Sequence, residues 1–278
     1  MYGSKFKGRL LFGVLIFVLL VLGFEILPLL SVIAGSFTDD AGSAFTFKQY
    51  IKAFTSPFYL QSMKNSILLA LCSSIAGIAI ALAGAYSISK LSPKARDVIL
   101  TLSNMTSNFA GVPLAFAFII ILGNNGLFVL LLKNLGWDIS ESFNLYSITG
   151  LILVYIYFQI PLGILLLYPA LDAVRAEWRE AALLLGASPL GFWLHIGIPV
   201  LLPGLMGTFN VLFANAMGAY ATAVALTNGS NNLLPIRIGA LVSGDIFTNP
   251  QLAGALSVVL GLIMVAVTMI NRKLLKVR

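Results

Sequence analysis

Charged residues gather in one interior stretch of the sequence, where Arg175, Glu177, Arg179 and Glu180 stand close together. The chain as a whole is 59% hydrophobic and only 10% charged, so a cluster of this kind is unusual in it. The carboxylate of Glu180 can form a charge-assisted hydrogen bond with an arginine or lysine of another protein. These residue types indicate a contact site for a partner that lies outside the apolar part of the chain.

The segment around this cluster predicts a short helix, a sharp turn and a second helix over about residues 172–191. On a helix, one face would carry Glu177, Glu180, Ala181 and Leu184. Gly186 follows the last apolar residue, where a glycine in the left-handed conformation commonly ends a helix. Ser188 and Pro189 then have the residue types of an N-cap and a first helical position.

Ala181 and Ala182 are expected to leave a flat surface beside Glu180, which permits close approach by another protein. The alternative is a plain amphipathic connector that rests on lipid headgroups. Helices of that kind usually carry a richer basic face than this segment does. Helix physics alone leaves both interpretations open.

Other reactive side chains are sparse and form no catalytic set. Cys72 is the single cysteine and His195 the single histidine, so the sequence cannot build a typical zinc site. Residues 3–10 have the glycine spacing of a phosphate-binding loop, but Arg9 and Leu10 replace the required lysine and serine or threonine. We therefore predict a non-catalytic chain whose first residues are a basic anchor.

These residues are expected to be positioned by an all-α polytopic membrane fold, formed by residues 1–278 as a single domain. Apolar runs of about 20 residues recur along the chain, and the mean hydropathy is +0.98. Six spans are predicted, at Leu10–Ile33, Ser66–Ser89, Met105–Leu122 with a break at Gly111–Pro113, Ser147–Leu171, Phe192–Leu226 and Leu252–Ile270. The first is too long for a cleavable signal peptide. Two shorter apolar segments, Leu127–Leu132 and Leu233–Val242, are predicted to be interfacial or re-entrant.

The orientation follows from the distribution of the 17 basic residues. One set of span ends carries 12 of them: Lys5, Lys7, Arg9, Lys90, Lys94, Arg96, Arg175, Arg179, Arg272, Lys273, Lys276 and Arg278. The other set carries five: Lys48, Lys52, Lys64, Lys133 and Arg237. The richer set is cytoplasmic by the positive-inside rule, which places both termini and the loop of residues 172–191 inside. The net charge is +7, but the basic residues flank the apolar spans instead of forming one face, which argues against a nucleic-acid partner.

The spacing of the charged loop matches a family pattern. It consists of Glu180-Ala181-Ala182, three residues, Gly186, nine residues, Ile196, one residue and Ile198-Pro199. This resembles the EAA loop of binding-protein-dependent ABC importer permeases, with Ile198 in place of leucine as the one departure. Two further segments, Asn65-Ser66 and Gly218–Leu226, are similar to the polyamine-type (spermidine/putrescine) permease subunits.

This resemblance implies the type I importer fold and a set of partners in the bacterial cytoplasmic membrane. Two permease subunits would pair in the bilayer above two copies of a cytosolic ABC ATPase, and an extracytoplasmic solute-binding protein would deliver the substrate. ATP and magnesium would be bound by the ATPase, with no cofactor in this chain. Glu180 would be the charged coupling contact, Ala181 and Ala182 the close-packing surface, and Gly186 the turn.

Polar residues inside the predicted spans are candidates for the translocation path. Glu25 is the only carboxylate within an apolar span, which points either to transport of a cation or to a structural pairing near Pro28. Four further candidates are Tyr155, Gln159, Asn215 and Tyr220, with helix–helix hydrogen bonding as the alternative for each. The repeat of Ser73, Gly77, Ala81 and Ala85 at every fourth position predicts a seam of close helix packing.

The leading function is thus an importer permease subunit, and two other classes compete with it. A channel or secondary carrier that works without ATP would not need the coupling loop, and a carrier often shows an internal repeat. A membrane enzyme would need a nucleophile, an acid–base pair or a metal cluster. The resemblance favours a polyamine substrate, with phosphonates or similar small organic solutes next.

Overall fold

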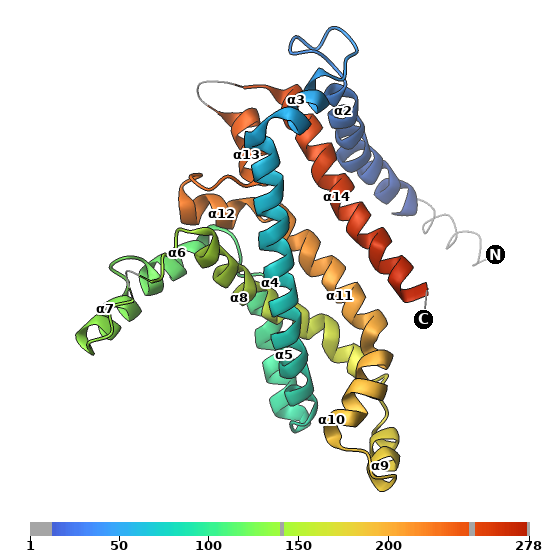
Figure 1. Cartoon of the computed structure of the whole chain (residues 1–278). Coiled ribbons are helices and arrows are strands. Elements are labelled where there is room, and N and C mark those ends of the chain that lie inside the picture. Colours follow the sequence, from blue (N-terminus) through green and yellow to red (C-terminus); the bar gives the residue numbers. More distant parts are fainter. Residues whose placement is uncertain (1–12, 140–141, 245–247, 277–278) are drawn as a thin grey trace, which may run out of the picture. The chain divides into compact units, whose positions relative to one another are not determined.

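A computed structural model describes residues 13–139, 142–244 and 248–276. Figure 1 shows a chain of helices, and within these residues there is no strand, only one antiparallel bridge between Thr38 and Phe45. The chain divides into two compact units. One comprises residues up to Leu60 together with Arg237–Gly261, and the other comprises Gln61–Ile236 together with residues from Leu262 onward.

Among the described residues, six helical segments are long and apolar enough to cross a membrane. They are Gly13–Ser36, Pro57–Ser89, Val112–Asn134, Ile148–Leu171, Pro189–Gly218 and Pro250–Leu275. This confirms the predicted all-α polytopic class with six spans. The start of the predicted first span and the basic residues at positions 5, 7, 9 and 278 lie outside the described residues.

Three predicted spans match helices closely. The fourth is α8 (Ile148–Leu171), and its N-cap Ser147 accepts a hydrogen bond from the Gly150 N–H. The second and sixth are extended as α4 (Pro57–Ser89) and α14 (Pro250–Lys276). Each of these two begins with proline, which fits the first turn of a helix because the nitrogen there needs no hydrogen-bond partner.

The predicted third span, Met105–Leu122, is wrong in its extent although its break is where the sequence placed it. The residues before the break belong to α5 (Pro93–Ser107), and α6 (Val112–Leu122) begins after Gly111, whose φ is +78°. The serine, threonine and asparagine residues of α5 lower its hydropathy. The apolar segment instead continues through α7 (Leu127–Asn134), which contains the supposed interfacial turn.

The predicted fifth span, Phe192–Leu226, is also broken. It consists of α10 (Pro189–Phe192), a π-helical turn and α11 (Ile198–Gly218), followed by α12 (Tyr220–Thr227). Ala219 separates the last two with ψ of 71°. The apolar character continues across this break, so hydropathy alone did not reveal it. The remaining short apolar segment forms α13 (Leu234–Ser243).

Two π-helical turns lie immediately before prolines. η1 (Leu22–Ile26) precedes Pro28, and η2 (Trp193–Gly197) precedes Pro199. The amide after each turn donates to the carbonyl five residues earlier, from Leu27 to Leu22 and from Ile198 to Trp193. A proline ring clashes with the carbonyl four residues before it. One wide turn moves that carbonyl aside, so the helix continues through the proline.

The core of the larger unit includes the small-residue seam of α4 packed on α8. Ser73, Gly77, Ala81 and Ala85 are all buried, as predicted for close helix packing. A methyl group on Gly163 of α8 would lie 2.7 Å from Cβ of Ala81. The two backbones therefore approach so closely that only small side chains fit between them.

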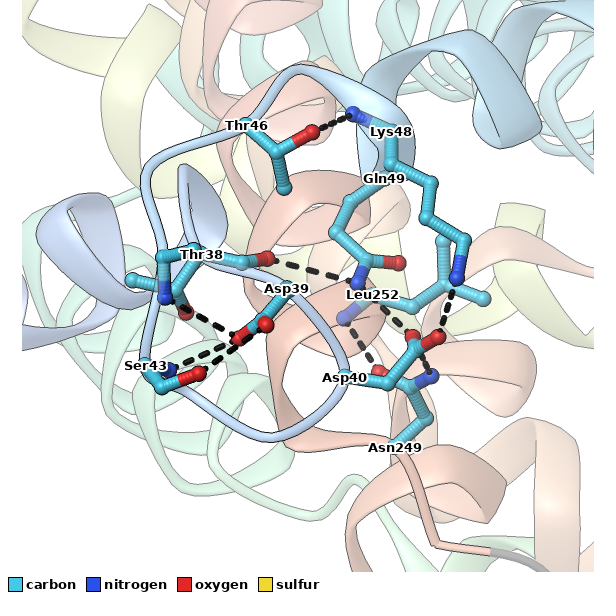
Figure 2. Close-up of polar contacts among 10 residues, drawn as sticks. Thr38, Asp39, Asp40, Ser43, Thr46, Lys48, Gln49, Asn249 and Leu252 are labelled. Carbon is cyan, nitrogen blue, oxygen red and sulfur yellow. Dashed lines mark hydrogen bonds and ion pairs between the residues drawn. The ribbon is translucent and has the colours of Figure 1, made fainter.

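The smaller unit contains α2 (Leu27–Ser36), α3 (Lys48–Thr55) and the loop between them. Figure 2 shows Asp40 of this loop as the centre of a polar network. Its carboxylate accepts hydrogen bonds from Nζ of Lys48 at 2.5 Å, Nε2 of Gln49 at 2.9 Å and Nδ2 of Asn249 at 2.9 Å. Asn249 in turn caps α14 by accepting from the Leu252 N–H at 2.8 Å. One carboxylate thus joins the loop to two helix starts.

The loop should open in acid. Hydrogen bonds from Gln49, Lys48 and Asn249 hold the pKa of Asp40 well below its usual 3.8. A lowered pKa stabilises the folded loop above the unfolded-state pKa, and this contribution is lost as the pH falls through the lower folded value. The protection factors for amide exchange of residues 37–50, which correct for the pH dependence of the intrinsic rate, should therefore stay high from pH 7 to about 4 and fall below that range. Asp40→Asn should raise exchange already at pH 7.

The matched control is Asp138→Asn, which removes another surface ion pair, with Nζ of Lys133 at 3.4 Å. That change should leave exchange of residues 37–50 unaltered. Slow exchange of these residues in Asp40→Asn at pH 7 would show that the network does not hold the loop.

Candidate functional site

The predicted turn of the charged loop is present in detail. α9 (Ala176–Leu184) has Leu185 as its C-cap, and Gly186 follows with φ of +84°. The Ala187 N–H donates to the Ala182 carbonyl and the Gly186 N–H to the Leu183 carbonyl, both at 3.0 Å. These two bonds define a Schellman motif, which satisfies carbonyls left over at the helix end.

The second helix of the loop begins as its residue types indicated. Ser188 is the N-cap of α10, and its hydroxyl accepts a hydrogen bond from the Gly191 N–H at 3.0 Å. Pro189 occupies the first helical position. In Figure 1, α9 and α10 lie next to each other at one end of α11. The loop is therefore a defined helix–turn–helix and not an irregular connection.

The exposed surface of this loop differs from the predicted one. Ala182 is only 7% exposed and packs within its own chain, so it offers little surface to a partner. Glu180 and Ala181 are exposed. The largest exposed apolar side chains are Leu184 and Leu185, at 88% and 89%. The sequence placed Leu184 on one face of the predicted helix, but it did not identify either leucine as a contact residue, although their position at the end of that helix was a usable signal.

Tyr86 of α4 connects the charged loop to the membrane helices. Its hydroxyl accepts a hydrogen bond from Nη1 of Arg179 at 3.1 Å, and its ring meets that of Trp193 edge-on at 5.1 Å between centroids. Lys90 lies over the same ring at 5.2 Å. A side chain on Gly197 would collide with the Trp193 ring, so glycine is required there. Sequence reasoning did not identify Tyr86, because its partners lie far along the chain.

A cavity of about 660 Å³ lies between α9 and the side chains of Tyr86 and Trp193. Its charged lining consists of Lys90, Asp172, Arg175, Glu177, Arg179 and Glu180. Three cations thus face three anions, and the cavity has no dominant sign of charge. Glu180 lines this space while remaining exposed, so its carboxylate can be reached from solvent.

The candidate path residues fall into two groups. Tyr155 and Gln159 are buried: the Tyr155 hydroxyl donates to the Ala219 carbonyl at 2.6 Å, and Nε2 of Gln159 donates to Oγ of Ser73 at 2.9 Å. These bonds support the helix-packing interpretation of both side chains. Their role in transport stays a prediction.

The second group is exposed. Glu25 lies in η1 on a span whose central window has no buried residue. Asn215 lies one turn before the end of α11, and Tyr220 begins α12 with 40% of its surface exposed. Asn210 is engaged instead, because its Oδ1 accepts a hydrogen bond from Nδ2 of Asn271 on α14. No cluster of three or more metal-ligating residues occurs in the described part of the chain.

The sequence is similar to known transport permeases. Residues 73–275 match the family described as binding-protein-dependent transport system inner membrane component. A spermidine/putrescine transport system permease protein, PotB of Haemophilus influenzae, is 27% identical over 236 residues, which cover 83% of this chain and 80% of that protein. The sulfoquinovosyl glycerol transport system permease protein SmoH of Agrobacterium fabrum is 27% identical over 228 residues, covering 81% and 73%.

The fold is shared with a solved structure of a bacterial ABC transporter involved in the import of the acidic polysaccharide alginate. The TM-score is 0.73 at 15% sequence identity, with 99% of this chain and 98% of that chain covered. A family match over most of the chain, six apolar helices and this fold agree with one another. The chain therefore belongs to the binding-protein-dependent transport system inner membrane components, as a multi-pass ABC importer permease subunit of a bacterial inner membrane.

Proposed function

We propose that the loop of residues 172–191 is the contact through which a cytosolic ATPase drives this permease. The observation that carries the proposal is the exposed end of α9, where Leu184 and Leu185 project beside the carboxylate of Glu180. Large apolar side chains next to one charge are typical of a partner contact. The hydrogen bond between Arg179 and Tyr86 then gives motion of α9 a direct route to α4.

The proposed assembly contains a second permease subunit, two copies of the cytosolic ABC ATPase and an extracytoplasmic solute-binding protein. ATP and magnesium belong to the ATPase, and this chain contributes no cofactor. The asymmetry of basic residues supports cytoplasmic termini and a cytoplasmic coupling loop. In this assembly residues 1–278 act as a single membrane domain.

The proposed cargo is a small organic solute. Polyamines are the substrates named for one set of relatives and sulfoquinovosyl glycerol for another of equal identity. A polyamine is polycationic, and its support within a described span is the single carboxylate of Glu25. Glu25→Gln would lower polyamine uptake without loss of the assembled complex if that residue pairs with the cation.

Removing the coupling contact should detach the ATPase. Truncating one partner of a buried charged contact at an interface costs about 2–5 kcal/mol. We expect Glu180→Ala, and separately Leu184→Asp, to reduce copurification of the ATPase with tagged permease by at least ~tenfold. The control is Asp138→Ala, which removes an exposed carboxylate that lies 3.4 Å from Nζ of Lys133 and outside the loop. Full recovery of ATPase and of substrate-stimulated hydrolysis in both loop variants would show that coupling occurs elsewhere.

A further inference from the structure

Two helix breaks of the larger unit meet at one place. The break between α5 and α6 contains Gly111, and its N–H donates to Oγ1 of Thr222 on α12 at 2.9 Å. The break between α11 and α12 is at Ala219, whose carbonyl accepts the Tyr155 hydroxyl at 2.6 Å. Figure 1 shows α6 and α12 side by side at this junction. Broken helices leave backbone groups without helical partners, which is how many transporters build solute sites within the membrane.

α5, which ends at the junction, carries two different stripes of exposed side chains. One stripe is polar and consists of Asp97, Thr101, Asn104 and Asn108. The other is apolar and consists of Val98, Leu102 and Met105. In each stripe the members are three or four positions apart, so they lie along one side of α5. An apolar stripe is compatible with lipid or protein, whereas exposed amide groups are costly to bury without a hydrogen-bond partner and therefore favour contact with water.

Further polar groups lie close to the same junction in the chain. Asn215 and Tyr220 flank the break at Ala219 and are both exposed. Asn104 and Asn108 lie at the end of α5. The four residues together supply three amides and one phenol next to the two helix breaks. None of these four side chains is a carboxylate or an ammonium group. The one carboxylate of the polar stripe, Asp97, lies 11 positions before Asn108, about 16 Å along a helix, and Nε of Arg96 is 3.8 Å from it.

We infer that this junction is a solute-binding site of the translocation path, and that it takes an uncharged, hydrogen-bonding solute such as a polyol or glycoside. Amides and hydroxyls offer donors and acceptors that match hydroxyl groups in number and geometry. A polycation would need carboxylates in its site. Each pairing of an ammonium group with a carboxylate 4 Å away is worth about 4 kcal/mol near a protein surface, and the described residues of the junction offer no such pairing. The inference rests on the proposed permease function and narrows its substrate.

The test is thiol labelling of the complete importer in sonicated native membrane vesicles, which expose both faces. Cys72, the single cysteine of the sequence, is first replaced in Cys72→Ala. Asn104→Cys and Asn215→Cys are then made in that background, with Leu102→Cys from the apolar stripe of the same helix as the control. Each variant is treated with a cationic and an anionic membrane-impermeant methanethiosulfonate. The two rates are compared with those of free cysteine.

We expect both asparagine positions to react at least ~tenfold faster than position 102. The ratio of cationic to anionic rates should stay within about threefold of that for free cysteine. Slow labelling at both asparagine positions, or equal labelling at position 102, would show that the stripe faces lipid or protein. A cationic preference above ~tenfold, equivalent to 1.4 kcal/mol, would overturn the uncharged class and favour a polyamine.

The same preparations separate this inference from the proposed function. Recovery of the ATPase with tagged permease reports on coupling and does not depend on the polar stripe. If the ATPase is recovered but the asparagine positions do not react, only the solute site is rejected. If those positions react in a complex that recruits no ATPase, only the coupling proposal is rejected.

Discussion

Gly163→Val should lower the thermal stability of the folded permease. Any Cβ at this position would lie 2.7 Å from Cβ of Ala81, closer than carbon atoms approach in real structures. α4 and α8 would have to separate along a seam that is buried from Ser73 to Ala85. Overpacking costs about 1–3 kcal/mol for modest insertions, and a branched side chain between two backbones belongs at the upper end. Thermal unfolding in detergent should show a Tm lower by several degrees.

Gly207→Val is the matched control for this change. Gly207 lies inside α11, and a Cβ there would meet nothing within 4 Å. Both substitutions exchange a helical glycine for the same side chain, so they share any change in helix propensity. Equal Tm values for the two variants would mean that α4 and α8 adjust freely at the seam.

Gly186→Val should uncouple the permease while leaving the membrane helices folded. Gly186 has φ of +84°, a conformation that costs about 1–2 kcal/mol for ordinary residues and more for β-branched ones. A Cβ there would meet nothing within 4 Å, so the effect comes from the backbone and not from a collision. α9 would lose its turn, and Leu184, Leu185 and Glu180 would no longer be presented together. ATPase recovery and substrate-stimulated hydrolysis should both fall at least ~tenfold.

Gly186→Asn separates backbone conformation from side-chain size. Asparagine tolerates the left-handed region and occurs at this helix position, so that variant should keep most of its activity. If Val and Asn variants hydrolyse ATP alike in proteoliposomes, the turn is not needed for coupling.

The sequence predicted the features that local chemistry determines. Gly186 and Ser188-Pro189 have turn and cap roles that depend on their immediate neighbours, and both roles are present. The buried seam followed from spacing alone. The break at Ala219 did not, because its carbonyl is held by Tyr155 from a helix more than 60 positions earlier. Propensity carries no information about such a contact.

The sequence predicted where the charged loop lies but not which of its side chains are exposed. The motif located the loop, but the orientation of α9 decides which residues point outward. Ala182 turned inward, and the leucines at the helix end turned outward. That choice depends on where the loop docks on the rest of the chain. The third span was wrong in its extent for a different reason, since its apolar segment continues past the bend at residues 123–126 into α7.

The Schellman turn at Gly186 makes the loop stiff before any partner arrives. The carbonyls of Ala182 and Leu183 already have their donors, and Ser188 fixes the start of the next helix. Ordering a flexible residue costs roughly 1–2 kcal/mol, and a preformed loop has lost that entropy during folding instead of at docking. Under the proposed function, few contacts would then suffice for attachment of the ATPase. A stiff loop also transmits displacement instead of absorbing it, so in the proposed assembly a small movement of α9 would reach Tyr86 through its hydrogen bond with Arg179.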